Sequence, residues 1–153
     1  RKKFLLRLSG GNYTELEPGR LRFHSRDFSL EILNTSRDDQ RLYEFSVSKG
    51  EEEEVWQVQL DVFERVSRAG VRVLARDVSN GSCRLALRCT AERGDRVSFS
   101  WAGRDNGSAG ICSGAGAFLN VSYPPRAEFG CVCTARNAVS SGRAAFLPPQ
   151  CGA

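Results

Sequence analysis

The sequence predicts an all-β protein built from two β-sandwich domains in tandem. Apolar and polar residues alternate in most segments, glycine and asparagine interrupt these segments at short intervals, and all six cysteines lie between Cys83 and Cys151. Alternation with period two is typical of strands that bury one face. Short strands separated by frequent turns are typical of sandwiches and barrels.

In the first 64 residues the positions of the apolar residues predict five strands. We expect them at residues 2–8, at Leu21 and Phe23, at Phe28, Leu30 and Ile32, at 42–48, and at 55–62, with the loop KGEEEE between the last two. On the last strand Trp56 and Val58 share one face, and Val55 and Gln57 share the other, because successive side chains point to opposite sides.

The second half continues the same pattern. Strands are expected at residues 83–89 and 97–101, around Cys133, and over 119–123 with Leu119, Val121 and Tyr123 inward. Turns are expected along the whole chain at Gly10-Gly11-Asn12, Gly50, Asn80-Gly81, Arg93-Gly94-Asp95 and Gly142, since glycine and asparagine tolerate the backbone conformations of hairpin turns.

The cysteines and asparagines indicate an extracellular chain. The cysteine count is even, and five of the six asparagines stand in Asn-x-Ser/Thr motifs. Disulfides persist in oxidising compartments, and this motif accepts glycan in secreted chains. We expect glycosylation at Asn12, Asn34, Asn80, Asn106 and Asn120.

The order Cys89, Trp101, Cys133 matches the immunoglobulin fold, in which a disulfide joins the two sheets and a tryptophan packs on it. Cys131 lies two residues before Cys133 and shares its face, and Cys112 is its nearest unassigned partner. Our expected pairing is Cys89–Cys133, Cys83–Cys151 and Cys112–Cys131, one of fifteen possibilities. A zinc site is disfavoured because His24 is the only histidine and is distant.

The run Asp39-x-Arg41-x-Tyr43-x-Phe45 resembles the motif of variable-type immunoglobulin domains, with Tyr43 as the corner tyrosine and Phe45 in the place of a cysteine. We expect residues 1–64 to be a variable-type domain lacking strands A to C, which would expose its apolar inner face. Residues 65–70 are the expected linker. Residues 71–153 are the expected constant-type (C2) domain.

The join LDVFERVSRAGVRVLARDVSNGSCRLALRCTAERGDRVSFSW, the run CTARNAVSS and the closing PPQC resemble the SLAM (signalling lymphocytic activation molecule) family of leukocyte receptors. The resemblance implies a type I glycoprotein at the cell membrane, which binds the same or a related receptor on a facing cell. It also implies SH2-type adaptors on a tail outside this chain and permits a viral attachment protein as a partner. A heterophilic receptor and a soluble or viral decoy remain alternatives.

In this family the contact is made by the C, C′, F and G strands of the first domain. The outward residues expected on the last two strands and their loop are Glu44, Ser46, Ser48, Lys49, Glu51, Glu52, Glu53, Val55, Gln57 and Gln59. Strand C′ offers Lys3, Leu5 and Arg7, or the opposite parity. The glutamates from Glu51 to Glu54 are either a docking element facing a basic strand or a solvated hairpin tip.

Other function classes find little support in the sequence. No catalytic motif accompanies His24, so an enzyme is not expected. The arginines are dispersed and the net charge is only +4, which does not favour nucleic acid. We expect no cofactor and no metal. Calcium binding by the glutamates of the loop is disfavoured, because consecutive strand residues point to opposite faces and do not converge on one ion.

Overall fold

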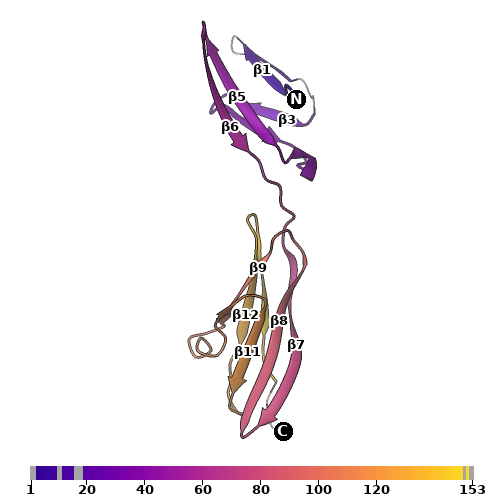
Figure 1. Ribbon diagram of the computed structural model, residues 1–153, viewed down its shortest axis with the longest axis vertical. Coiled ribbons are helices and arrows are strands. Elements are labelled where there is room, and N and C mark those ends of the chain that lie inside the picture. The colour runs from indigo at the N-terminus through magenta and orange to yellow at the C-terminus, as the bar shows by residue number, and fades with distance from the viewer. Residues whose placement is uncertain (1–2, 10–11, 16–18, 150, 152–153) are drawn as a thin grey trace. The chain divides into compact units, whose positions relative to one another are not determined.

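A computed structural model describes residues 3–9, 12–15, 19–149 and 151. Its contacts divide the chain into two units, Arg1–Val62 and Phe63–Ala153 (Figure 1). The secondary structure of the described residues is β-strand with one short 3-10 helix, which confirms the all-β prediction.

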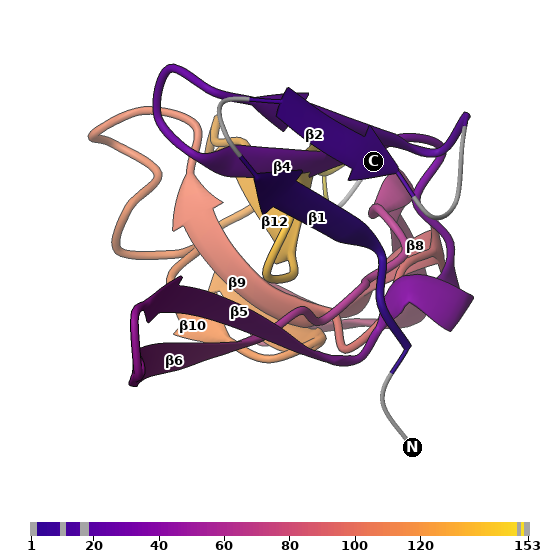
Figure 2. The ribbon, with the colours of Figure 1, turned by 90° about the horizontal axis from the view of Figure 1, so that it is seen from above.

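The first unit contains three antiparallel hairpins. Their strands are β1 (Leu6–Ser9) and β2 (Asn12–Glu15), β3 (Leu21–His24) and β4 (Ser29–Ile32), and β5 (Leu42–Lys49) and β6 (Glu52–Gln59). The 3-10 helix η1 (Arg37–Asp39) precedes β5. Figure 2 shows β5 and β6 as one two-stranded ribbon.

Several strand boundaries in this unit differ from the sequence predictions. The predicted strand 55–62 starts earlier, at Glu52, and ends at Gln59, because Lys49 pairs with Glu52 around a two-residue turn. The predicted loop KGEEEE is therefore mostly strand. Phe28 lies before β4, in the turn, with a φ of 59°, and the first strand begins only at Leu6.

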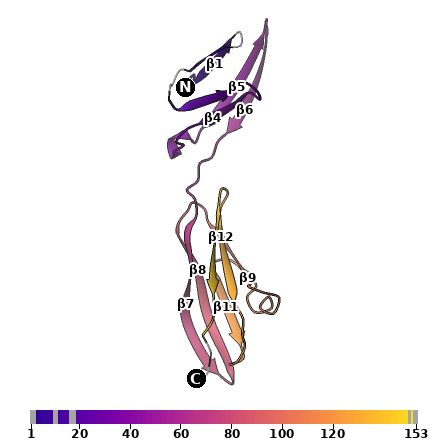
Figure 3. The same cartoon turned by 180° about the vertical axis from the view of Figure 1, so that it is seen from behind.

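The second unit is a sandwich of two antiparallel sheets (Figure 3). One sheet has the order β11-β8-β7, from β7 (Ser67–Ser79), β8 (Ser82–Arg93) and β11 (Phe118–Tyr123). The other has the order β10-β9-β12-β13, from β9 (Ser98–Gly103), β10 (Gly114–Ala115), β12 (Cys131–Arg136) and β13 (Ser141–Phe146). Since β7 begins at Ser67, part of the segment 65–70 that the sequence suggested as a linker lies in this strand.

The core of this sandwich follows the predicted alternation. Leu85 and Leu87 on β8 are buried, and so are Leu119, Val121 and Tyr123 on β11. Burying a leucine side chain contributes roughly 1.5–3 kcal/mol relative to leaving it exposed. The two apolar faces meet between the sheets, as in an immunoglobulin domain.

Three disulfides have the predicted connectivity. Cys89–Cys133 joins β8 to β12 across the two sheets, with the Cα atoms 6.2 Å apart. Trp101 pairs with Cys133 in the ladder, is only 4% exposed, and its indole donates to the carbonyl of Gly116 at 3.1 Å. Cys83–Cys151 and Cys112–Cys131 complete the set.

The predicted turns have mixed outcomes. Asn80 and Gly81 both have positive φ, 51° and 71°, and link Ser79 to Ser82 as a two-residue hairpin turn. Gly142 is not a turn residue, because it pairs with Ala135 inside the β12–β13 ladder.

The β12–β13 turn is instead formed by Asn137. Its side-chain oxygen accepts hydrogen bonds from the amides of Val139 and Ser140 and from the Ser140 hydroxyl. An asparagine side chain that binds its own downstream backbone supplies this turn without a glycine.

Candidate functional site

The β5–β6 hairpin carries all ten residues predicted to bind a partner. Its eight paired positions run from Leu42 opposite Gln59 to Lys49 opposite Glu52. Gly50 has a φ of 60° in the turn, a conformation that glycine adopts without a Cβ penalty. The ladder fixes which side chains share a face.

One face of this hairpin, here called the candidate face, gathers most of the predicted residues. The cross-strand pairs are Glu44 with Gln57, Ser46 with Val55, and Ser48 with Glu53, and Gln59 stands opposite Leu42. All eight are exposed. The candidate face is therefore a mainly polar strip, with Leu42 at the base and Val55 within it as its apolar residues.

Three predicted residues lie elsewhere on the hairpin. Lys49 and Glu52 form the last ladder pair, which falls on the opposite face, and Glu51 is in the turn. Leu42 belongs to the candidate face and was absent from the predicted set. Leu42 is two residues before Glu44 and four before Ser46, so the alternation along the strand could have assigned it to this face.

Toward the base of the hairpin the opposite face is apolar and partly exposed, whereas its last pairs toward the tip carry Glu54, Lys49 and Glu52. Tyr43 faces Val58, and Phe45 faces Trp56, with their ring centroids 5.5 Å apart. Phe45, Trp56 and Val58 are 45%, 48% and 60% exposed. The shared face and its exposure both agree with the prediction from the sequence.

A hydrogen-bonded cluster holds the base of the hairpin. The Tyr43 hydroxyl donates to the carbonyl of Asp39 at 2.7 Å, which confirms the corner tyrosine. The Asp39 carboxylate accepts from both terminal nitrogens of Arg20, at 3.2 and 2.7 Å, and from the amide of Ser36. The bond from Arg20, helped by Ser36, holds the pKa of Asp39 below its usual value.

The hairpin tip concentrates negative charge. Glu51 to Glu54 carry exposed carboxylates in and beside the turn, and Glu52 pairs with Lys49 in the ladder. Along β6 they alternate between the two faces. Across the described residues, no three His, Cys, Asp or Glu side chains gather as a metal site would require.

The predicted strand C′ contributes one of its three named residues to a strand. Arg7 lies in β1 opposite Thr14 and is exposed, whereas Lys3 and Leu5 precede β1.

The predicted glycosylation sites leave β5 and β6 free. Asn34 follows β4, and Asn80, Asn106 and Asn120 belong to the second unit. All four are exposed, and the side chain of Asn12 lies outside the described residues. A glycan on any of these four asparagines would therefore be attached outside the candidate face.

Comparison with known proteins identifies two curated relatives. A dog protein named signaling lymphocytic activation molecule is 30% identical over 140 residues, covering 91% of this chain and 41% of the relative. The mouse protein of the same name is 34% identical over 140 residues, covering 88% and 40%. The chain thus spans about two-fifths of the length of these relatives, and no family model matches it.

Among solved structures, an amphioxus IgVJ-C2 molecule is similar with a TM-score of 0.49 and 20% identity, covering 90% of this chain and 77% of that one. No helix within the described residues is long and apolar enough to cross a membrane.

Proposed function

This chain is related to the signaling lymphocytic activation molecule (SLAM) family, and we propose that it is the extracellular part of an immunoglobulin-type immune receptor. It acts by binding and not by catalysis. The partner is a second copy of the receptor, or a related family member, on a facing cell.

The observation that supports this proposal best is the β5–β6 register. It gathers Ser46, Ser48 and Gln57 with their neighbours on one exposed face that carries no glycosylation motif. The serines of this face lose little side-chain conformational entropy on ordering, whereas its glutamines and glutamates lose about as much as lysine or arginine would. A surface of this kind suits weak, reversible contacts whose avidity comes from many copies on two membranes.

The charges of the hairpin restrict how two copies would dock. In a contact with two-fold symmetry, both copies use the same surface patch. Two acidic tips placed face to face would repel each other, so Glu51 to Glu54 must meet basic groups instead. Arg7 on β1 is an exposed basic residue of the same unit. Such a contact weakens as salt screens it.

Cell aggregation tests this function. Cells that display the full-length protein should aggregate with one another, and Ser46→Arg on the candidate face should reduce aggregation at least tenfold. Ser100→Arg on β9 is the matched control, because Ser100 is also an exposed strand serine but lies in the other unit.

The outcomes separate the alternatives. Equal loss with both variants would contradict the candidate face. If cells with the wild-type protein do not aggregate but bind cells that lack it, the partner is heterophilic, and a secreted form with that behaviour would be a decoy. SH2-type adaptors and viral attachment proteins remain predictions that depend on the receptor assignment.

A further inference from the structure

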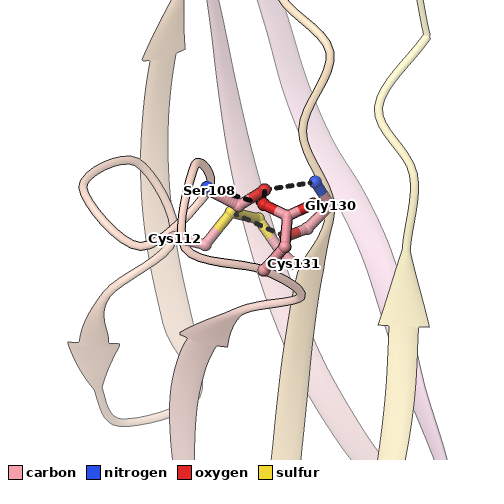
Figure 4. The surroundings of a disulfide bond; sticks show 5 residues. Ser108, Cys112, Gly130 and Cys131 are labelled. Carbon is pink, nitrogen blue, oxygen red and sulfur yellow. Dashed lines mark hydrogen bonds between the residues drawn. A yellow bond between two sulfur atoms is a disulfide. The ribbon is translucent and has the colours of Figure 1, made fainter.

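The motif Asn106-Gly107-Ser108 lies in the excursion loop, residues 104–113, which joins β9 to β10 in the second unit. The asparagine and the serine that N-glycosylation requires differ in exposure. Asn106 is exposed, whereas Ser108 is fully buried at 0%. Figure 4 shows Ser108 between the Cys112–Cys131 disulfide and Gly130.

The hydroxyl of Ser108 is engaged on both sides. It donates to the Asp105 carboxylate at 2.8 Å and accepts from the amide of Gly130 at 3.0 Å. The same carboxylate accepts from the amide of Ser108 at 2.9 Å. The hydrogen bond from the Ser108 hydroxyl holds the pKa of Asp105 below its usual value.

The loop is closed tightly around this serine. The Cys112 amide donates to the Ser108 carbonyl at 3.0 Å, and Cys112 is itself bonded to Cys131. Both cysteines are fully buried. A Cβ atom added at Gly103 would lie 2.6 Å from the carbonyl carbon of Ser108, so no space separates the loop from the end of β9.

N-glycosylation requires the hydroxyl that the closed loop hides. The transferase binds the serine or threonine hydroxyl of the motif while the asparagine nitrogen attacks C1 of a lipid pyrophosphate-linked oligosaccharide. The new C1–N bond replaces the C1–O bond, the amide loses a proton, and the lipid pyrophosphate leaves. In the closed loop the transferase could reach Asn106 but not Ser108.

We propose that closure of the Cys112–Cys131 disulfide and glycosylation of Asn106 compete, so that Asn106 accepts glycan only while the excursion loop is open. Closure oxidises the two thiols to a disulfide, and the disulfide of an oxidoreductase accepts the two electrons and the two protons and becomes a dithiol. This inference rests on the proposed function in one respect, because it places the chain in the secretory pathway.

The spacing along the chain gives this competition a time window. Cys131 lies 25 residues after Asn106, and synthesis at about 5–20 residues per second delivers it about 1–5 seconds later. The disulfide cannot form before Cys131 has been made. Glycan transfer to Asn106 must therefore occur during this interval or in the further time before the two cysteines are oxidised. Asn34 has no such limit, because the first 64 residues contain no cysteine and Ser36 is exposed.

Glycopeptide mass spectrometry of the full-length protein secreted or displayed by animal cells tests the proposal. Wild-type occupancy at Asn106 should be incomplete and should at least double in the variant with Cys112→Ala and Cys131→Ala. Occupancy at Asn34 should stay constant. Complete occupancy in the wild type, or no change at Asn106 in the variant, would overturn the proposal.

A second pair of variants keeps the disulfide. Asp105→Ala removes the acceptor of the Ser108 hydroxyl and should raise occupancy at Asn106, whereas Asp105→Asn retains a side-chain oxygen and should change it less. A rise at Asn34 as well would indicate general misfolding and count against a local cause.

A cell-free assay distinguishes this inference from the proposed function. If cells leave every motif unmodified, the extracellular assignment is wrong. Unglycosylated protein can then be incubated with purified transferase and lipid-linked oligosaccharide. The oxidised chain should stay unmodified at Asn106, and the double cysteine variant should be modified there. Equal modification of the two would refute the competition.

Discussion

The two tryptophans of the chain stand on strands with the same alternating pattern but in different surroundings. Trp101 is 4% exposed beside the Cys89–Cys133 disulfide, whereas Trp56 is 48% exposed and packs on Phe45 across a single hairpin. Alternation decides which side chains share a face. Whether that face leaves water depends on a second layer that covers it.

Each unit contains one tryptophan, so each can be followed separately by fluorescence. In a Trp56→Phe background Trp101 reports on the second unit, and in a Trp101→Phe background Trp56 reports on the first. The following predictions use these backgrounds, from the largest expected effect to the smallest.

Removal of the inter-sheet disulfide should have the largest effect. Its cysteines are 44 residues apart, and the loop-entropy relation gives about 4 kcal/mol of stabilisation for such a loop. Cys89→Ala with Cys133→Ala should lower the free energy of unfolding of the second unit by about this amount in urea titrations. An unchanged midpoint would show that packing around Trp101 holds the sheets together without the bond.

The next largest difference between the two units is expected from truncating one leucine in each and comparing the loss in unfolding free energy. Leu87 is fully buried on β8, and Leu42 is 58% exposed on β5. Leu87→Ala should cost the second unit about 2–5 kcal/mol, because it removes buried contacts and leaves a cavity. Leu42→Ala should cost the first unit less than about 1 kcal/mol. Equal costs in urea titrations would contradict the difference in burial.

Two tyrosines should have similar, smaller effects in both units. The Tyr43 hydroxyl donates to Asp39 and the Tyr123 hydroxyl to Pro149, each to a backbone carbonyl. Tyr43→Phe and Tyr123→Phe should each cost about 1 kcal/mol, the usual net contribution of one hydrogen bond. Thermal unfolding followed at the tryptophan of each unit measures both. If only one variant loses stability, water replaces the tyrosine hydrogen bond in the other unit.

The smallest effect concerns pH and the first unit only. Because the folded-state pKa of Asp39 is lowered, its stabilising contribution is present above the unfolded value of about 3.9 and is lost as pH falls through the folded value. Unfolding temperatures between pH 2 and 6 should fall at the acidic end less steeply for Asp39→Asn than for the wild type. Asp77→Asn, on β7, is the control and should leave the slope of the first unit unchanged.

The sequence predicted the core of the second unit correctly but missed some of its strands, including β7 (Ser67–Ser79). Cysteine order, the position of Trp101 and the parity of Leu119 to Tyr123 identified that core, because a buried face fixes the register of a strand. The β5–β6 boundaries were wrong by up to three residues. Consecutive glutamates give no period-two signal, so only the pairing of Lys49 with Glu52 shows that they form a strand.

The amino-acid sequence by itself determined the fold class and the side chains that share a face, because these follow from chemical type and alternation. For the disulfides it favoured one of fifteen pairings, and the structure confirmed that pairing. Tertiary structure decided what depends on distant partners. It brought Arg20 to Asp39 across 19 positions and buried Ser108 against Gly130 across 22. No local pattern marks such pairs, since the chain must fold before their atoms come within hydrogen-bonding distance.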